Sequence, residues 1–167
     1  MSNTILVGYA SHYGSTQEVA EAIAAVLGDH GLAVDLRHLR KVKTLADYSA
    51  VVIGAPLFMF HWHEDAHSFL SRHHEALLER PVAIFALGPV HDPHDEQEWL
   101  VSHAQLDTEL AKYPWLKPVA LELFGGKYSP GKLRFPINVL AGDAPASDLR
   151  DWATIRAWAD NLAAKLA

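Results

Sequence analysis

The sequence predicts an α/β fold: a three-layer, doubly wound structure on a five-stranded parallel sheet with the strand order 2-1-3-4-5. Short apolar runs alternate with segments of helical periodicity along the 167 residues, which is typical of βαβ units. Three of these runs are apolar throughout, as expected for strands that are covered on both faces. Since a chain of this length suits one core, we expect residues 1–167 to form a single domain.

Five segments have the length and composition of strands. The runs at 4–10, 50–55 and 82–87 are continuously apolar and belong at the centre of the predicted sheet. The segments 33–38 and 119–124 take the two outer places in that order.

Helices are predicted between the strands from apolar residues at spacings of three and four. The first should end near Gly28 or Gly31, the next should run from about His63 to just before Pro81, and another should end before Pro114. Residues 41–48 leave room for only a short helical piece. The expected apolar stripes are Val19, Ile23, Val26 and Leu27; Phe69, Leu70 and Leu77; Trp99, His103, Leu106 and Leu110; and Trp152, Ile155, Ala159, Leu162 and Leu166.

Composition excludes several classes of function. The net charge is −6 and no basic run is longer than Arg40-Lys41, so we expect no nucleic-acid partner. There is no cysteine, which excludes disulfides, iron–sulfur clusters and thiol redox chemistry. No apolar run reaches the roughly 20 residues of a membrane span, and the N-terminal residues lack the pattern of a secretory signal. We therefore expect a cytoplasmic protein, and the sequence leaves its oligomeric state open.

The segment from Gly125 to Asp148 interrupts the alternation, because it is rich in glycine, proline and scattered charges. Long irregular segments inside a compact domain are usually functional. We expect this one to fold over an edge of the active face.

The turn after the first strand has the composition of a phosphate site. Ser11, Ser15 and Thr16 supply hydroxyl donors, and Gly14 allows a tight turn. The first helix of a parallel α/β sheet also directs unpaired backbone N–H groups at this position. The turn has neither the lysine of a P-loop nor the three glycines of a dinucleotide site. It therefore predicts a neutral nest for a phosphate monoester; the alternative is a plain helix cap, since Ser15 to Glu18 has the pattern of a capping box.

This turn resembles the flavin mononucleotide (FMN) phosphate loop of the flavodoxin-like family, with Tyr13 in place of the usual threonine. The resemblance implies that the chain binds FMN noncovalently, transfers one or two electrons, and holds the phosphate with the loop from 11 to 16. The implied phosphate-binding residues are Ser11, His12, Tyr13, Gly14, Ser15 and Thr16.

Other segments are similar to the flavodoxin-type, menaquinone-dependent protoporphyrinogen oxidases and their relatives. They are Val51 to Ala55, His61-Trp62-His63, Phe124 to Lys127, and Asp151-Trp152. A quinone and a porphyrinogen are the redox partners that this resemblance implies. However, Phe58 stands where those enzymes carry an arginine, and the segment 140–148 is short and polar. The resemblance therefore carries over FMN and the redox class, and leaves the substrate open.

The flavin ring is expected between the loops that follow the third and fourth strands. Aromatic faces stack well on a flat conjugated ring, so Phe58, Phe60 and Trp62 are candidate walls. Backbone N–H groups from Gly88 onward are candidate donors to the edge of the ring. The expected ring-binding residues are Pro56, Leu57, Phe58, Met59, Phe60, Gly88, Pro89, Val90 and His91.

The chain has 11 histidines, and two of them, His61 and His63, are candidate proton relays beside the ring. A different interpretation is a metal site in which His63 and His67 bind zinc together with His91 or His94. A third is a flavin-free interaction module. Flavin colour in the purified protein distinguishes the first interpretation from the others.

Overall fold

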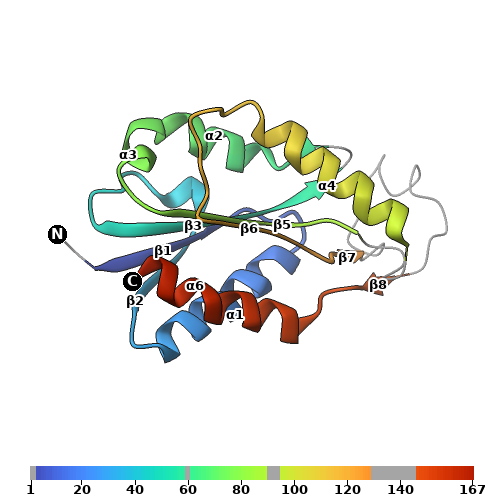
Figure 1. Cartoon of the computed structure of the whole chain (residues 1–167), viewed down its shortest axis with the longest axis horizontal. Helices are drawn as coiled ribbons and strands as arrows, with labels where there is room; N and C mark the ends of the chain where they lie inside the picture. The colour runs from blue at the N-terminus through green and yellow to red at the C-terminus, as the bar shows by residue number, and fades with distance from the viewer. Residues whose placement is uncertain (1–2, 59–60, 90–94, 129–145) are drawn as a thin grey trace.

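The computed structural model describes residues 3–58, 61–89, 95–128 and 146–167. Its main sheet has the order β2-β1-β3-β5-β6, with parallel pairing between every pair of neighbours in that order. This confirms the predicted order and the doubly wound fold (Figure 1). The strands are β1 (Thr4–Tyr9), β2 (Ala33–His38), β3 (Tyr48–Phe58), β4 (His61–Trp62), β5 (Val82–Leu87), β6 (Ala120–Phe124), β7 (Lys127–Tyr128) and β8 (Ser147–Asp148).

Helices cover both faces of the sheet (Figure 1). One face carries α1 and α6, and the other carries α2, α3 and α4. Each face has its own buried cluster of aliphatic and aromatic side chains, to which β1, β3 and β5 contribute on alternate positions. The helices are α1 (Ser15–Asp29), α2 (Glu64–Arg72), α3 (His74–Leu78), α4 (Glu96–Leu110) and α6 (Trp152–Leu166), with a short 3-10 helix η1 (Leu39–Lys41).

The third strand is longer than predicted and folds back on itself. Residues Pro56 to Phe58, expected in a loop, continue β3, and β4 pairs antiparallel with its end. The reason is Trp62, which is 1 % exposed and whose indole Nε1 donates to the carbonyl of Ala55 at 2.9 Å. The main sheet therefore has six strands instead of five among the described residues.

The helical stripes were largely correct, with two differences. The helix predicted from about His63 to Pro81 is broken at His73, whose backbone (φ −109°, ψ 20°) separates α2 from α3. His103, placed on the apolar stripe of α4, is exposed, and Ser102 and Glu109 are buried in its place. The spacing of apolar residues cannot predict that a carboxylate such as Glu109 lies on the buried face of α4.

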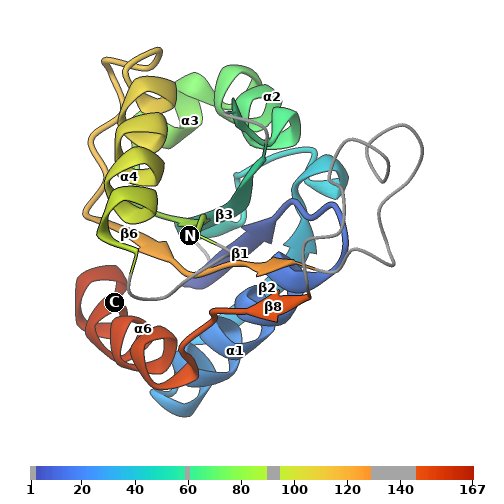
Figure 2. The same ribbon diagram turned by 90° about the vertical axis from the view of Figure 1, so that its right-hand side faces the viewer.

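The two ends of the irregular segment after β6 lie close together, because β7 and β8 pair antiparallel. This pair lies near the start of α1 (Figure 2). Most of the predicted loop over the active face, residues 129–145, lies outside the described residues.

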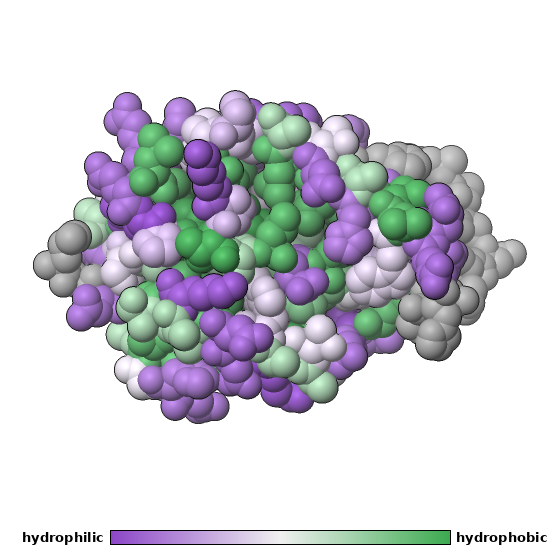
Figure 3. Space-filling view, in the orientation of Figure 1, coloured by the Kyte–Doolittle hydropathy of each residue, from purple (hydrophilic) through white to green (hydrophobic). Residues whose placement is uncertain are grey.

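On the face shown in Figure 3, hydrophilic and hydrophobic side chains are interspersed. Val119 and Leu121, next to and within the edge strand β6, are among the exposed large apolar residues. Within the described ranges, none of the helices combines the length and the apolar character needed to cross a bilayer.

Candidate functional site

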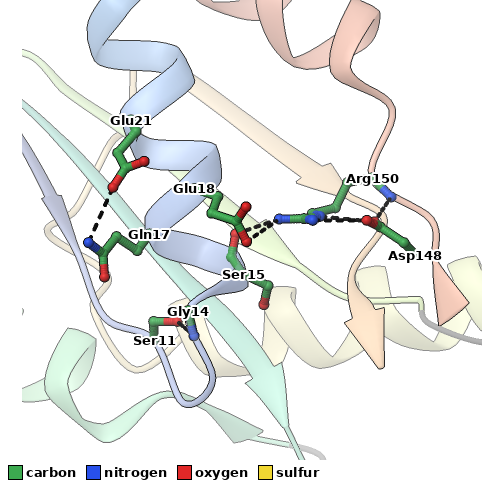
Figure 4. A network of polar contacts seen from close by, with 8 residues as sticks. All are labelled: Ser11, Gly14, Ser15, Gln17, Glu18, Glu21, Asp148 and Arg150. Carbon is green, nitrogen blue, oxygen red and sulfur yellow. Dashed lines mark hydrogen bonds and ion pairs between the residues drawn. The ribbon is translucent and has the colours of Figure 1, made fainter. Parts of the chain in front are cut away.

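The turn between β1 and α1 has the geometry of an anion-binding loop. Gly14 adopts φ 90°, ψ −10°, a left-handed conformation that favours glycine. The hydroxyl oxygen of Ser11 accepts a hydrogen bond from the Gly14 N–H at 2.8 Å and closes the turn (Figure 4). The Ser11 hydroxyl group thus stabilises the conformation of the loop through a hydrogen bond within the turn.

Helix α1 begins without a side-chain cap. Its N-cap is Gly14 and its first helical residue is Ser15, so the alternative of a capping box that starts at Ser15 is wrong. The backbone N–H groups of a first turn have no acceptor within the helix. No side chain in the described part of the chain replaces that acceptor at the α1 cap. The groups at residues 15–17 are therefore available to an anion.

Thr16 gives a second, independent sign of a ligand. Its side chain is fully buried, and its Oγ1 has no hydrogen-bond partner among the described residues. Buried hydroxyl groups are nearly always paired, because an unpaired one costs about 1–3 kcal/mol. A phosphate oxygen at the start of α1 would supply the missing partner. The residues present therefore fit the phosphate end of FMN.

A buried arginine, which the sequence analysis missed, connects this loop to the far end of the chain. Arg150 has a side chain that is only 3 % exposed. Its Nε and Nη2 each donate to a carboxylate oxygen of Asp148 at 2.9 Å. Its Nη1 donates to the backbone oxygen of Ser15 at 3.2 Å and to Glu18 at 3.3 Å (Figure 4).

The guanidinium also lies 4.8 Å from the centre of the Trp152 ring. The hydrogen bond from Arg150 is the main reason why the pKa of Asp148 lies below its usual range. Two carboxylates offset the charge of Arg150, so the donors offered to a phosphate remain uncharged dipoles. The sequence did not predict this contact, because Arg150 and the loop are far apart along the chain.

Aromatic side chains join the loop to the end of β3. The His12 ring centre lies 5.0 Å from that of Phe58 and 4.3 Å from that of His63. Tyr13 contacts Phe58 edge-on, with ring centres 6.3 Å apart. Phe58, a predicted flavin wall, is therefore placed beside the phosphate loop.

His63 serves as the N-cap of α2. Its Nδ1 accepts the backbone N–H of Asp65 at 3.0 Å, so in this structure the ring carries its proton on Nε2. Burial lowers the pKa of His63 below its ordinary value, and the charge of His12 lowers it further. Burial likewise lowers the pKa of His12, although the charges of Asp65 and Glu64 oppose this. Both shifts favour the neutral form of the imidazole ring.

A cleft of about 580 Å³ opens beside the phosphate loop. At its far wall Glu109, with a side chain 4 % exposed, is hydrogen-bonded to His61 Nδ1 at 2.9 Å and lies 2.6 Å from His67 Nε2. Lys112 Nζ lies 3.0 Å from the same carboxylate. The residues that line the cleft are His12, Phe58, His61, Trp62, His63, Glu64, His67, Glu109 and Lys112.

Burial alone would raise the pKa of Glu109. Hydrogen bonds from His61 and Lys112 and the charge of His67 outweigh burial, so the pKa lies below its usual range. Glu109 is therefore an ionised carboxylate inside the protein at neutral pH. Neither it nor Lys112 was predicted, because Glu109 lies at the end of α4 and Lys112 in the following turn, and no sequence motif links them to His61.

The structure changes the predicted ring-binding set. Trp62 lies in the core at the base of the cleft, and with only 1 % of its surface exposed it offers little area for stacking with a flavin ring. The N–H of Gly88 donates to the carbonyl of Phe124 at 2.9 Å, so it is not a donor to the ring edge. The residues Met59, Phe60, Val90 and His91 lie outside the described residues, as does His94 of the zinc alternative.

Within the ranges that the structure describes, no group of three or more histidine, aspartate or glutamate side chains could hold a metal ion. His63 and His67 also have different partners, since one caps α2 and the other contacts Glu109 and Tyr113.

Comparison with known proteins agrees with the geometry of the loop. The sequence matches the flavodoxin domain family over residues 6–136. The chain belongs to the flavodoxin domain family. Membership in this family implies FMN as the cofactor, in agreement with the free N–H groups and the buried Thr16 hydroxyl at the start of α1.

The solved structures show the same fold at low identity. A short-chain flavodoxin associated with a PDU bacterial microcompartment has a TM-score of 0.63 at 16% identity, with 99% of both chains covered. Oxidised flavodoxin 2 from Bacillus cereus has a TM-score of 0.57 at 16% identity, covering 98% of this chain and 97% of the other.

Among curated proteins, protoporphyrinogen IX dehydrogenase [quinone] of Escherichia coli strain K12 is 26% identical over 87 residues. That match covers 51% of this chain and 48% of the relative. The chain thus spans about half the length of this curated relative.

Proposed function

We propose that this protein is an FMN-dependent redox protein that binds the cofactor phosphate with residues 11–16 and transfers electrons through the flavin ring. The observation that carries this proposal is the fully buried Thr16 hydroxyl without a protein partner, at the start of a helix that no side chain caps. Bound FMN would supply one- or two-electron redox chemistry, whereas the chain itself has no cysteine for thiol redox chemistry.

The roles of the protein groups differ. The loop binds the phosphate through uncharged dipoles, while Arg150 fixes the first turn of α1 through Ser15 and Glu18. Phe58 and the loop residue His12 contact each other, line the cleft and offer aromatic surface to a ring. The end of β3 and the segment from 88 to 91 would flank that ring.

The experiment is to purify the protein, add FMN and remove the excess. A yellow protein with flavin absorbance bands is the expected result. The variant Ser15→Ala/Thr16→Ala should lose most of the bound flavin, whereas Ser68→Ala, at an exposed position on α2, should retain it. Colourless wild-type protein, or equal binding by all three forms, would contradict the proposal.

A second candidate is a quinone-linked oxidase that acts on a porphyrinogen. The observation that favours it is the 26% identity to the protoporphyrinogen IX dehydrogenase. It is tested by following protoporphyrin fluorescence after protoporphyrinogen and menaquinone are added to the flavin-loaded protein. No increase above the flavin-free control would exclude this activity.

A further inference from the structure

The buried carboxylate of Glu109 organises the polar side of the cleft. It is fixed from three directions, by His61 of β4, His67 of α2 and Lys112 in the turn after α4. A buried ionised group held by several partners orients them in turn. The side chains around Glu109 are therefore in defined positions.

Of the histidines that line the cleft, His61 is the one suited to exchange protons with a ligand. His63 uses Nδ1 to cap α2, and His67 contacts Tyr113 through Nδ1 and Glu109 through Nε2. The His12 ring packs at a tilt against the rings of Phe58 and His63. By contrast, His61 binds Glu109 through Nδ1 only, and its side chain is 75 % exposed.

We infer that His61, oriented by Glu109, is the proton donor of the cleft and that this protein therefore carries out proton-coupled electron transfer. This inference rests on the proposed function. Glu109 acts as a positioning residue: by accepting from Nδ1–H it directs Nε2, the nitrogen that exchanges the proton, away from itself. In the Ser-His-Asp triad a carboxylate likewise holds a histidine through Nδ1–H and leaves Nε2 to exchange protons.

His61 would donate one of the two protons in the two-electron reduction of an organic acceptor. The acceptor gains two electrons and two protons. One proton leaves Nε2 of the charged His61 while the Nδ1–H bond to Glu109 is retained, and His61 then takes a proton from water. The electrons and the other proton would be supplied by the redox cofactor of the proposed function.

Titratable and charged groups face His61 from three directions. Glu109 lies on α4 and Lys112 in the turn that follows it, His67 and Glu64 lie on α2, and His12 lies on the phosphate loop. Glu64 lines the same cleft, is exposed and is not among the residues that contact His61. It therefore offers a matched control for a change at Glu109.

The first readout is independent of activity. Nitrogen-15 NMR of the histidine rings in the flavin-free protein should show the neutral His61 ring as the Nδ1–H tautomer. Glu109→Gln should shift it toward Nε2–H, while Glu64→Gln should leave it unchanged. A wild-type ring already in the Nε2–H form would overturn the inference.

The second readout compares two acceptors after the flavin-loaded protein has been reduced. Dichlorophenolindophenol takes up two electrons and protons, whereas ferricyanide takes up one electron and no proton. His61→Gln and Glu109→Gln should slow the indophenol reaction by about 10²-fold, the lower range for general acid catalysis, and leave the ferricyanide reaction unchanged. Equal slowing with both acceptors, or no slowing with either, would overturn the inference. Failure of the wild-type protein to bind flavin would instead overturn the proposed function.

Discussion

The phosphate loop and the polar wall of the cleft offer a ligand different kinds of contact. The loop is one continuous segment, Ser11 to Thr16, and offers backbone dipoles and hydroxyl groups. The wall brings Glu109, His61 and Lys112 together from two elements far apart in the sequence. The loop therefore suits a group of fixed charge that stays bound, whereas the wall suits protons that come and go. The predictions below test this difference, beginning with the largest expected effect.

Arg150→Ala should destabilise the protein most. The change leaves Asp148 and Glu18 without their common partner next to the first turn of α1. Loss of one member of a buried ion pair costs about 3–5 kcal/mol. Because both carboxylates are partly exposed, we expect about 2–3 kcal/mol in urea unfolding, with weaker FMN binding.

Arg156→Ala is the control, since Arg156 lies exposed on α6. It should change the free energy of unfolding by less than about 0.5 kcal/mol. If both variants unfold at the same urea concentration, Arg150 does not hold the loop.

Gly14→Ala should have the next largest effect, and it isolates backbone strain. An added Cβ would meet no atom within 4 Å, but φ is 90°, a conformation that costs an alanine about 1–2 kcal/mol. Gly28→Ala provides a matched control, since its Cβ also meets nothing within 4 Å and Gly28 lies inside α1. It should stabilise the protein by up to about 1 kcal/mol. Changes of the same sign in thermal unfolding would contradict the assigned loop geometry.

Lowering the pH should destabilise the flavin-free protein through the histidines between the two regions. Burial lowers the pKa of both His12 and His63, so below the ordinary value of about 6.5 the unfolded chain binds more protons than the folded one. The contribution of these two histidines to the free energy of unfolding is therefore present above about pH 6.5. It decreases as the pH falls from about 7 to 5.

Urea unfolding at several pH values measures this decrease. His63→Asn should make it shallower, because asparagine can still accept the Asp65 N–H as the cap of α2 but does not titrate. An unchanged slope would show that His63 does not contribute to the pH dependence.

The sequence predicted what is encoded locally. The strand order followed from apolar runs, and the loop from Ser11 to Thr16 followed from three hydroxyls and one glycine in a single turn. It did not predict the contacts of Arg150 or Glu109, because charged side chains are normally expected at the surface. Glu18 lies 132 residues from Arg150 along the chain, and His61 lies 48 residues from Glu109. Only the tertiary structure brings the members of each pair together.

Trp62 also has a position that the sequence did not predict, although it is an aromatic residue and not a charged one. An aromatic residue after a central strand fits a flavin wall as well as a core position, and periodicity does not distinguish the two. The hydrogen bond from its indole to Ala55 decides in favour of the core. The β3–β4 hairpin depends on this contact between residues of the same segment, yet the pattern of apolar residues contains no trace of it.

The most direct test of the central claim compares FMN with riboflavin, which lacks the phosphate, in wild-type protein and Thr16→Val. Valine has nearly the shape of threonine and removes only the hydroxyl that has no protein partner. Hydrogen bonds to charged groups contribute about 1.5–3 kcal/mol, so the Kd for FMN should rise by at least about 10-fold while the Kd for riboflavin stays the same. Equal changes for both ligands, or no change for FMN, would contradict a phosphate held at the start of α1.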